Sequence, residues 1–181
     1  VRIIRACRVL GIETVLAASE ADKDAAAARL ADKTVVIGPP YASTYLNIPV
    51  LMKTALDAGV QAVHPGYGFL SEKPELAQVC ADNGLIFVGP RPDHIRRMGD
   101  KLVARTLAAE AGVPVLPGSE RVKSFEDVLK VIEQIGFPVM LKAAAGGGGR
   151  GMKIITENEK DRIRQIFEEA NAEALASFGD G

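Results

Sequence analysis

The chain has 181 residues, with 22 Lys and Arg against 23 Asp and Glu, and a formal net charge of −1. This balance, without a block of basic residues, argues against a nucleic-acid groove, because neutralising phosphates requires clustered Lys and Arg. No apolar run approaches the about 18 residues that mark a membrane-spanning helix. The hydrophobic content of 48% and charged content of 25% are ordinary for a soluble globular protein. We therefore expect neither nucleic acid nor a membrane among its partners.

The first half of the chain alternates helix and strand patterns. Helical spacing of apolar residues predicts helices over about 3–10, 48–58 and 75–83. Short apolar runs bounded by Gly or Pro predict strands at 14–18, 34–38, 60–63 and 85–88. This alternation is typical of a parallel, doubly wound α/β sheet, in which ligands sit beyond the carboxyl ends of the strands. The segment His64-Pro65-Gly66-Tyr67-Gly68 follows the third strand at such an end.

The second half has a different order of elements. A helix over 100–111 is followed by a Pro-interrupted linker over 113–118, and Ser124 with Asp127 predicts a capping box worth about 1 kcal/mol for the next helix. Strands over 137–142 and 152–155 then flank a glycine run, and an amphipathic helix comes last. This order indicates an α+β unit. We therefore predict two domains, 1–92 and 93–181, with a hinged lid over about 117–181.

The two cysteines, Cys7 and Cys80, lie far apart within helix-like patterns, so we expect reduced thiols and not a disulfide framework. The N-terminus lacks the charged and apolar regions of a secretory signal peptide. The predicted location is the cytoplasm, or the mitochondrion if a transit peptide was removed. With His64 and His94 as the two histidines, and no Cys/His cluster, a structural zinc site is not expected.

The glycine run is the most informative segment. Gly146, Gly147, Gly148 and Gly149 stand in succession between two predicted strands, which costs more conformational entropy than a plain hairpin needs. Without side chains, the backbone N–H groups of such a loop can approach a phosphate closely. Positive charge is added by Lys142 before the run and by Arg150, next to Gly151, after it. This pattern predicts a phosphate-binding loop.

The surrounding elements decide which kind of phosphate loop this is. Gly146, Gly148 and Gly151 satisfy the spacing of the dinucleotide fingerprint, but that fingerprint joins a strand to a helix, whereas this loop joins two strands. A Walker A loop is excluded because no Gly-Lys-Ser/Thr closes the segment. A glycine-rich hairpin that folds over a nucleotide fits the local pattern better.

At this point the motifs together resemble a known family, the ATP-grasp enzymes of the biotin carboxylase type. The segment from Lys142 to Met152 resembles the lid loop of that family, and further motifs follow in the family's order over essentially the whole chain: Val1–Cys7, Ala31–Asp32, Tyr45–Ile48, His64–Glu72, Met98–Lys101 and Gly112–Val115. The resemblance implies a Rossmann-like pre-ATP-grasp domain followed by the first part of an ATP-grasp domain. It also implies an N-terminal fragment, because the family's first strand would precede Val1.

The resemblance implies an activity as well. In such enzymes ATP activates bicarbonate as carboxyphosphate, with Mg²⁺, and CO₂ is transferred to biotin on a carrier. The partners implied are a biotin carboxyl carrier protein or domain and a carboxyltransferase of an acyl-CoA or pyruvate carboxylase, and an oligomer is expected. Val9 stands where the family commonly has an acidic residue, in a helix that contributes to the subunit interface of dimeric relatives.

The family's site residues carry over by position. Lys101, Lys142, Gly148, Gly149 and Met152 match its ATP-binding residues, and Lys101 also lies at a helix N-terminus, which favours anions. Further phosphate contacts are expected from Gly146, Gly147, Arg150 and Gly151. Tyr67, Gly68 and Glu72 would line the biotin and bicarbonate site, whereas His64 is expected to hold the turn by a hydrogen bond. Lys153 is expected to face solvent, and His94 to lie on the surface.

The general base and the acidic magnesium ligands of the family are expected beyond Gly181, so the 181 residues alone are expected to be an inactive part of the enzyme. Two rival functions remain. One is another ATP-grasp ligase, which should lack the His-Pro-Gly-Tyr-Gly turn. The other is a non-catalytic nucleotide-binding module of a larger complex.

Overall fold

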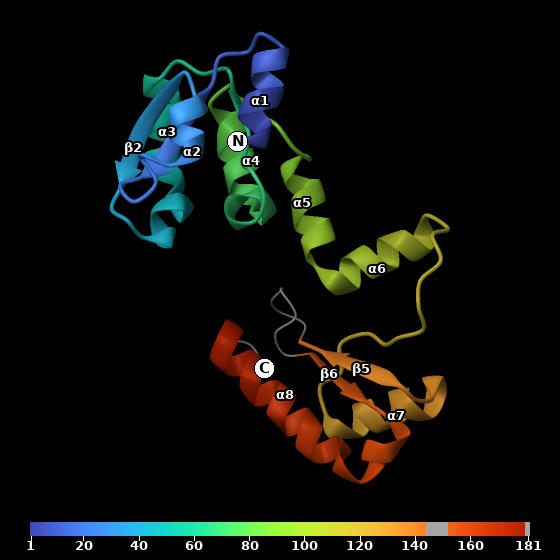
Figure 1. Cartoon of the computed structure of the whole chain (residues 1–181). Helices are drawn as coiled ribbons and strands as arrows, with labels where there is room; N and C mark the ends of the chain where they lie inside the picture. The colour runs from blue at the N-terminus through green and yellow to red at the C-terminus, as the bar shows by residue number, and fades with distance from the viewer. Residues whose placement is uncertain (144–151, 180–181) are drawn as a thin grey trace. The chain divides into compact units, whose positions relative to one another are not determined.

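The structure is a computed structural model, and it describes residues 1–143 and 152–179. Contacts divide the chain into two compact units, Val1–Gly99 and Asp100–Gly181 (Figure 1). The predicted division after residue 92 falls at the start of the helix α5 (Pro92–Gly99), which belongs to the first unit by its contacts. The assignment of domains 1–92 and 93–181 stays a prediction.

The first unit alternates short strands with helices. Its parallel strand pairs confirm the predicted α/β class: β1 pairs with β2, and β3 pairs with β4. The hydrogen bonds place these strands in two separate two-stranded sheets within the described residues. The elements in order are α1 (Arg2–Val9), β1 (Val15–Ser19), α2 (Ala26–Leu30), β2 (Lys33–Gly38), η1 (Ala42–Leu46), α3 (Ile48–Asp57), β3 (Ala62–Val63), η2 (Phe69–Glu72), α4 (Pro74–Asp82), β4 (Ile86–Phe87) and α5.

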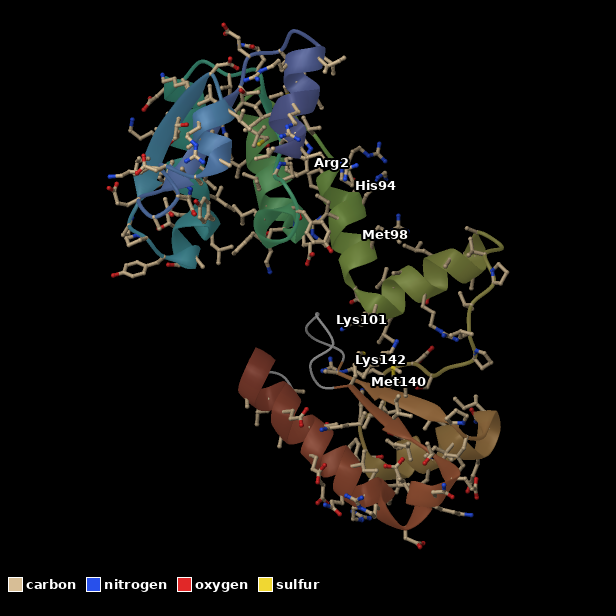
Figure 2. All side chains as sticks on the ribbon, viewed as in Figure 1. Arg2, His94, Met98, Lys101, Met140 and Lys142 are labelled. Atoms are coloured by element: carbon tan, nitrogen blue, oxygen red, sulfur yellow. The ribbon has the colours of Figure 1, made fainter. Side chains whose placement is uncertain are left out.

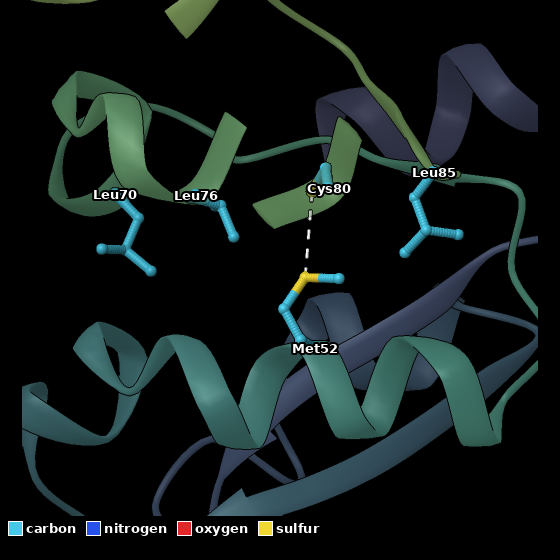
Figure 3. Packing of buried hydrophobic residues seen from close by; sticks show 5 residues of the cluster. All are labelled: Met52, Leu70, Leu76, Cys80 and Leu85. Atoms are coloured by element: carbon cyan, nitrogen blue, oxygen red, sulfur yellow. Dashed lines mark hydrogen bonds between the residues drawn. The ribbon is translucent and has the colours of Figure 1, made fainter. Parts of the chain in front are cut away.

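The core of the first unit lies between α3 and α4. Met52 of α3 faces Cys80 of α4, with 3.9 Å between the two sulfur atoms (Figure 3). Burial raises the pKa of the Cys80 thiol, because a thiolate would lose its hydration there. Cys7 and Cys80 are both free cysteines in the structure. The buried cluster consists of Met52, Leu70, Leu76, Cys80 and Leu85.

The second unit packs helices against one antiparallel strand pair. Its elements are α6 (Lys101–Glu110), α7 (Phe125–Ile135), β5 (Val139–Lys142), β6 (Met152–Ile155), η3 (Glu157–Arg162) and α8 (Ile163–Phe178). Apolar side chains of α7, α8 and β6 form its core, so both helices bury their apolar stripes against the inner face of the sheet. This arrangement matches the expected helix–strand–strand–helix order. The buried cluster consists of Val128, Ile132, Ile155, Ile163 and Ile166.

Three helix starts in this unit, those of α6, α7 and η3, are capped by side chains. Ser124 Oγ accepts from the backbone N–H of Asp127 at 3.2 Å, as predicted, but the Asp127 carboxylate accepts from the N–H of Lys123 at 3.2 Å. A reciprocal capping box that was not predicted links Thr156 and Glu159, whose carboxylate accepts from the Thr156 N–H at 3.0 Å. The Thr-x-x-Glu spacing is the signal that could have found it.

Over the described ranges, no helix has both the length and the apolar character needed to cross a membrane.

Candidate functional site

The outer face of the β5–β6 sheet is the candidate surface of the second unit. Lys142 pairs with Met152 across the strands, and Met140 pairs with Ile154. Because side chains alternate along a strand, these four lie on one face, opposite the inner face on which Leu141 is half-buried and Ile155 is buried. All four are exposed. The face therefore offers an apolar surface with one ammonium group at its edge.

Lys101 approaches the same edge. Its ammonium group donates a 3.2 Å hydrogen bond to the carbonyl of Ala143, the residue after Lys142 (Figure 2). The structure thus brings together Lys101 and Lys142, which are 41 positions apart in the sequence. Two ammonium groups beside an apolar face suit a ligand that combines a planar apolar ring with phosphates, since lysine bonds to phosphate oxygens are charge-assisted.

The helix N-terminus at Lys101 differs from the expectation. Asp100 Oδ1 accepts from the backbone N–H groups of Leu102 at 2.9 Å and Val103 at 3.0 Å. These amides are already satisfied by the cap, so they are not offered to an anion. The lysine side chains contribute their positive charge to a phosphate at this point.

The structure corrects the prediction for Lys153. This residue lies on the inner side of β6, and its ammonium group donates to a Glu173 carboxylate oxygen of α8 at 2.6 Å. The bond to Glu173 raises the pKa of Lys153. Lys153 was expected to face solvent, but the alternation of β6 turns it towards α8, where the acidic partner compensates its charge.

The glycine loop itself is not part of the described structure. Gly146, Gly147, Gly148, Gly149, Arg150 and Gly151 lie outside the described residues, so their phosphate contacts stay predictions. The described residues on either side, Lys142 and Met152, are direct cross-strand partners.

A separate candidate surface, in the first unit, is the turn after β3. His64 Nδ1 accepts from the N–H of Gly66 at 3.0 Å, which confirms the expected structural role of this histidine. Gly66 has φ 75° and Gly68 has φ 74°, values that favour glycine. Between them, Tyr67 is 99% exposed, and Glu72 lies exposed at the end of η2. The positive φ angles of the two glycines therefore define the backbone of the turn, and the side chain of Tyr67 between them is exposed.

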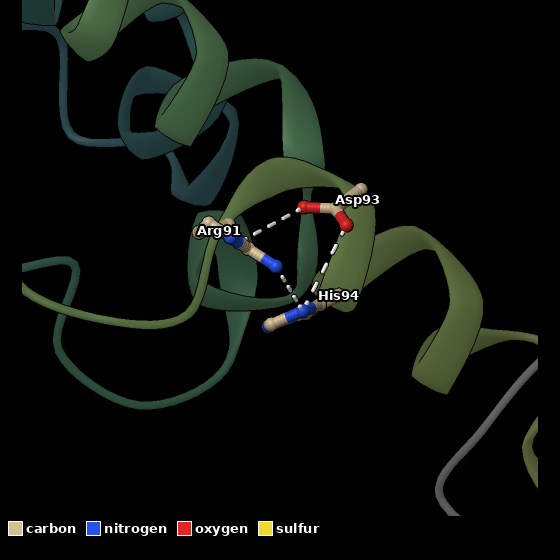
Figure 4. A network of polar contacts seen from close by, with 3 residues as sticks. All are labelled: Arg91, Asp93 and His94. Carbon is tan, nitrogen blue, oxygen red and sulfur yellow. Dashed lines mark hydrogen bonds and ion pairs between the residues drawn. The ribbon is translucent and has the colours of Figure 1, made fainter.

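His94 of α5 is exposed, as expected for a surface residue. Its Nε2 is 2.9 Å from an Arg91 nitrogen, and Asp93 Oδ1 lies 3.5 Å from Arg91 Nε (Figure 4). Since a guanidinium can only donate, Nε2 of His94 is the acceptor in this contact. The exposed charges of Arg91 and Asp93 compensate each other here.

Magnesium ligands were expected outside this chain. In the part of the chain that the structure describes, no three His, Cys, Asp or Glu side chains gather where they could hold a metal ion. The described residues therefore do not fit a Mg²⁺ site of their own.

Comparison with known proteins agrees with these features. Residues 1–95 match the family described as biotin carboxylase, N-terminal domain, and residues 100–181 match the carbamoyl-phosphate synthase L chain, ATP binding domain. An α/β unit followed by an ATP-binding unit of this type defines the class of ATP-grasp proteins. Within that class, the chain belongs to the biotin carboxylase family.

Individual relatives support this membership. The chain is 46% identical to a biotin carboxylase of Nostoc sp. over 99% of its length, and 45% identical to the mitochondrial pyruvate carboxylase of Mus musculus over all of it. It covers 40% of the former and 15% of the latter. A biotin carboxylase structure from Campylobacter jejuni, described as a beta-gamma-ATP complex, superposes with a TM-score of 0.91 at 41% identity, covering 99% of this chain and 40% of that one.

A second structure carries further ligands. The biotin carboxylase domain dimer of a Hydrogenobacter thermophilus 2-oxoglutarate carboxylase, in complex with MgADP, ADP and bicarbonate, has a TM-score of 0.89 and 41% identity, over 99% of this chain and 39% of that one.

Proposed function

We propose that the protein containing this chain carboxylates biotin at the expense of ATP and bicarbonate. The observation that carries the proposal is the outer face of β5–β6, where Lys101 and Lys142 meet beside exposed Met140, Met152 and Ile154. Its support from relatives is the beta-gamma-ATP complex of the Campylobacter jejuni biotin carboxylase and the MgADP and bicarbonate complex of the Hydrogenobacter thermophilus domain.

The role of the β5–β6 face in this reaction is to bind the nucleotide. Met152 and its neighbours Met140 and Ile154 would contact the adenine ring, because exposed apolar side chains stabilise a planar ring by burial. The ammonium groups of Lys101 and Lys142 would bind phosphate oxygens and stabilise the charge that develops when bicarbonate oxygen attacks the γ-phosphorus and ADP leaves. The sequence analysis did not predict Met140 and Ile154 as site residues. The alternation of side chains along the strands could have indicated them, because it places them on the same face as Lys142 and Met152.

The glycine loop would close this site. In the proposal, Gly148 and Gly149, helped by Gly146, Gly147 and Gly151, bring backbone N–H groups to the phosphates, and Arg150 adds a guanidinium. Closure would keep water from the carboxyphosphate. The cross-strand pair Lys142 and Met152 supports this role, because it fixes the two ends of the loop at the edge of the binding face.

The turn after β3 would serve the second substrate. We propose that Tyr67, Gly68 and Glu72 line the site for biotin and bicarbonate. The exposure of Tyr67 and the positive φ of Gly68 support this, since an exposed ring and an open backbone can contact a small ligand.

Partners and location follow from the same proposal. Biotin would arrive on a carrier protein or domain and leave for a carboxyltransferase. The proposed location is the cytoplasm, or the mitochondrion if a transit peptide was removed. An oligomer is proposed with α1 at the interface, because Val9, Leu10 and Ile12 at the end of this helix are strongly exposed. The Hydrogenobacter thermophilus relative, which is described as a domain dimer, supports an interface of this kind.

The test is steady-state kinetics of biotin-dependent, bicarbonate-dependent ADP release by the full-length protein. Lys142→Ala should raise the KM for ATP about tenfold or more, because one charge-assisted hydrogen bond is lost. Lys160→Ala, which changes an exposed lysine of η3, is the matched control and should leave this KM unchanged. An unchanged KM for ATP in Lys142→Ala would contradict the assignment.

The same assay separates the two rival functions. ADP release that requires a different amine or carboxylate acceptor would indicate another ATP-grasp ligase. ATP binding without turnover by the full-length protein would indicate a non-catalytic nucleotide-binding module.

A further inference from the structure

The turn after β3 is strained. Phe69, which follows Gly68, has φ 48°, and it is the one residue other than glycine with a positive φ among residues 1–143 and 152–179. A bulky residue adopts this backbone conformation only where its surroundings hold it. Leu70 supplies one anchor, since its side chain is buried in the core of the first unit. The side chain of Phe69 itself is exposed, so burial does not hold its backbone in place. A contact between Phe69 and another side chain is therefore needed.

Tyr45 of η1 provides this contact. Its ring lies against the ring of Phe69, with 6.3 Å between the centroids and a tilt of 47°, a favourable geometry for two aromatic rings. Tyr45 is half-buried, and η1 is the element through which the turn meets the end of the first strand pair.

The hydroxyl group of Tyr45 is itself held by hydrogen bonds. It accepts from the backbone N–H of Ser19, the last residue of β1, at 2.8 Å, and it donates to the Asp22 carboxylate. The Ser19 hydroxyl donates to the same carboxylate oxygen at 3.0 Å, and Ser19 is only 2% exposed. These two donors hold the pKa of Asp22 below its usual value, so the carboxylate stays an acceptor at neutral pH.

The rest of η1 is also held in place. The Thr44 hydroxyl donates to the carbonyl of Pro39 at 2.8 Å, and Thr44 is buried. A side chain at Gly38, at the end of β2, would lie 3.1 Å from the Thr44 methyl group, so η1 packs tightly on this strand end. The hydrogen bond and the packing of Thr44 therefore fix the position of η1, the element that carries Tyr45.

We propose that Tyr45 is a positioning residue for Tyr67 and Gly68. Tyr67 is almost fully exposed, so its placement depends on the backbone of the turn and not on packing of its own ring. The chain of contacts from the end of β1 through Asp22 and Tyr45 to Phe69 fixes that backbone. This inference rests on the proposed role of Tyr67 and Gly68 in lining the biotin and bicarbonate site.

The test uses Tyr45→Phe in the full-length protein. This change keeps the ring and removes the hydroxyl, so the ring of Tyr45 loses its connection to Ser19 and Asp22. The KM for free biotin or bicarbonate should rise about fivefold, because both hydrogen bonds of the hydroxyl are lost and the turn is held less firmly, while the KM for ATP should stay within about twofold. Tyr41→Phe is the matched control, because Tyr41 lies in the same segment with an exposed side chain, and it should change neither KM.

Amide hydrogen exchange gives an independent reading. In Tyr45→Phe the amides of Gly66, Ser71 and Lys73, which are hydrogen-bonded within the turn, should exchange faster, whereas the amides of α7 and β5 should not change. Phe69→Leu, which removes the ring contact and leaves the Ser19 and Asp22 bonds intact, should give the same pattern.

Two results would overturn the inference. One is an equal rise in the KM for ATP and for biotin, which would show a general loss of structure. The other is unchanged exchange of the turn in both Tyr45→Phe and Phe69→Leu. If the unaltered full-length protein lacks biotin-dependent turnover, the proposed function fails by itself, and the exchange experiment still decides whether Tyr45 fixes the turn.

Discussion

The two candidate binding surfaces of this chain are built in different ways. The face with Lys142 and Met152 is a regular antiparallel pair, in which alternation alone decides which side chains are exposed. The turn with Tyr67 is irregular backbone, with positive φ at Gly66, Gly68 and Phe69. The first surface depends on the core beneath it. The second depends on side chains such as Tyr45 that are distant in sequence, so substitutions should affect the two surfaces by different routes.

The largest effect is expected from the core under the sheet. Ile155 is fully buried below the β5–β6 face, and Ile155→Ala should destabilise the second unit by about 2–5 kcal/mol, through lost burial and the cavity left behind. Hydrogen exchange should accelerate in α7, β5 and α8, while the turn at Gly66 to Lys73 keeps its protection. Equal acceleration in the turn would show that the two surfaces are not independent. Ile154→Ala, on the exposed side of the same strand, is the control.

A smaller effect is expected from the cap of α7. Ser124→Ala removes the acceptor for the Asp127 N–H and should cost about 1 kcal/mol of stability in the second unit. Ser124→Asp should restore most of this, because aspartate also caps helices well. Chemical denaturation followed by circular dichroism measures both variants. A Ser124→Asp variant as unstable as Ser124→Ala would show that the hydrogen bond is not the cause.

The smallest effect is a pH dependence in the first unit. Thr14 donates to the Asp32 carboxylate through its N–H at 2.8 Å and its hydroxyl at 2.7 Å, and these bonds hold the pKa of Asp32 below the usual 3.8. A lowered folded-state pKa means that the stabilisation is complete above the usual value and is lost as the pH falls through the lowered one.

Thermal unfolding between about pH 2.5 and pH 6 measures this loss. The stability difference between the unaltered protein and Asp32→Asn should shrink as the medium becomes more acidic than about pH 4. Asp24→Asn, in the turn between β1 and α2, is the matched control. A difference that is constant over the whole range would contradict the role given to the Asp32 carboxylate.

Much of this organisation could be predicted from the sequence, for physical reasons. The helices around Met52 and Cys80 and the strands at 34–38 and 152–155 have clear apolar periodicity, and the structure confirms them within one or two residues at each end. The helices α2 and α5 were missed. The sequence of α2 is rich in Ala without an apolar stripe. The helix α5 is short and mostly polar, and Ile95 is its one buried residue, so it lacks the apolar content on which the helix predictions relied.

The site could be predicted in part. Lys101 and Lys142 were expected, and their approach at Ala143 is tertiary information that no local pattern contains. The same holds for the ring contact of Tyr45 with Phe69, and for the pairing of Lys153 with Glu173 on α8. In each case the partner is brought in by packing from a distant part of the chain.

The central claim is that the β5–β6 face binds the nucleotide and the turn after β3 binds the second substrate. It is tested most directly by measuring the KM values for ATP and for biotin in the same full-length protein with Lys142→Ala and with Tyr45→Phe. We expect a crossed result, in which Lys142→Ala raises the KM for ATP alone and Tyr45→Phe raises the KM for biotin alone. A rise of both KM values in both variants would contradict it.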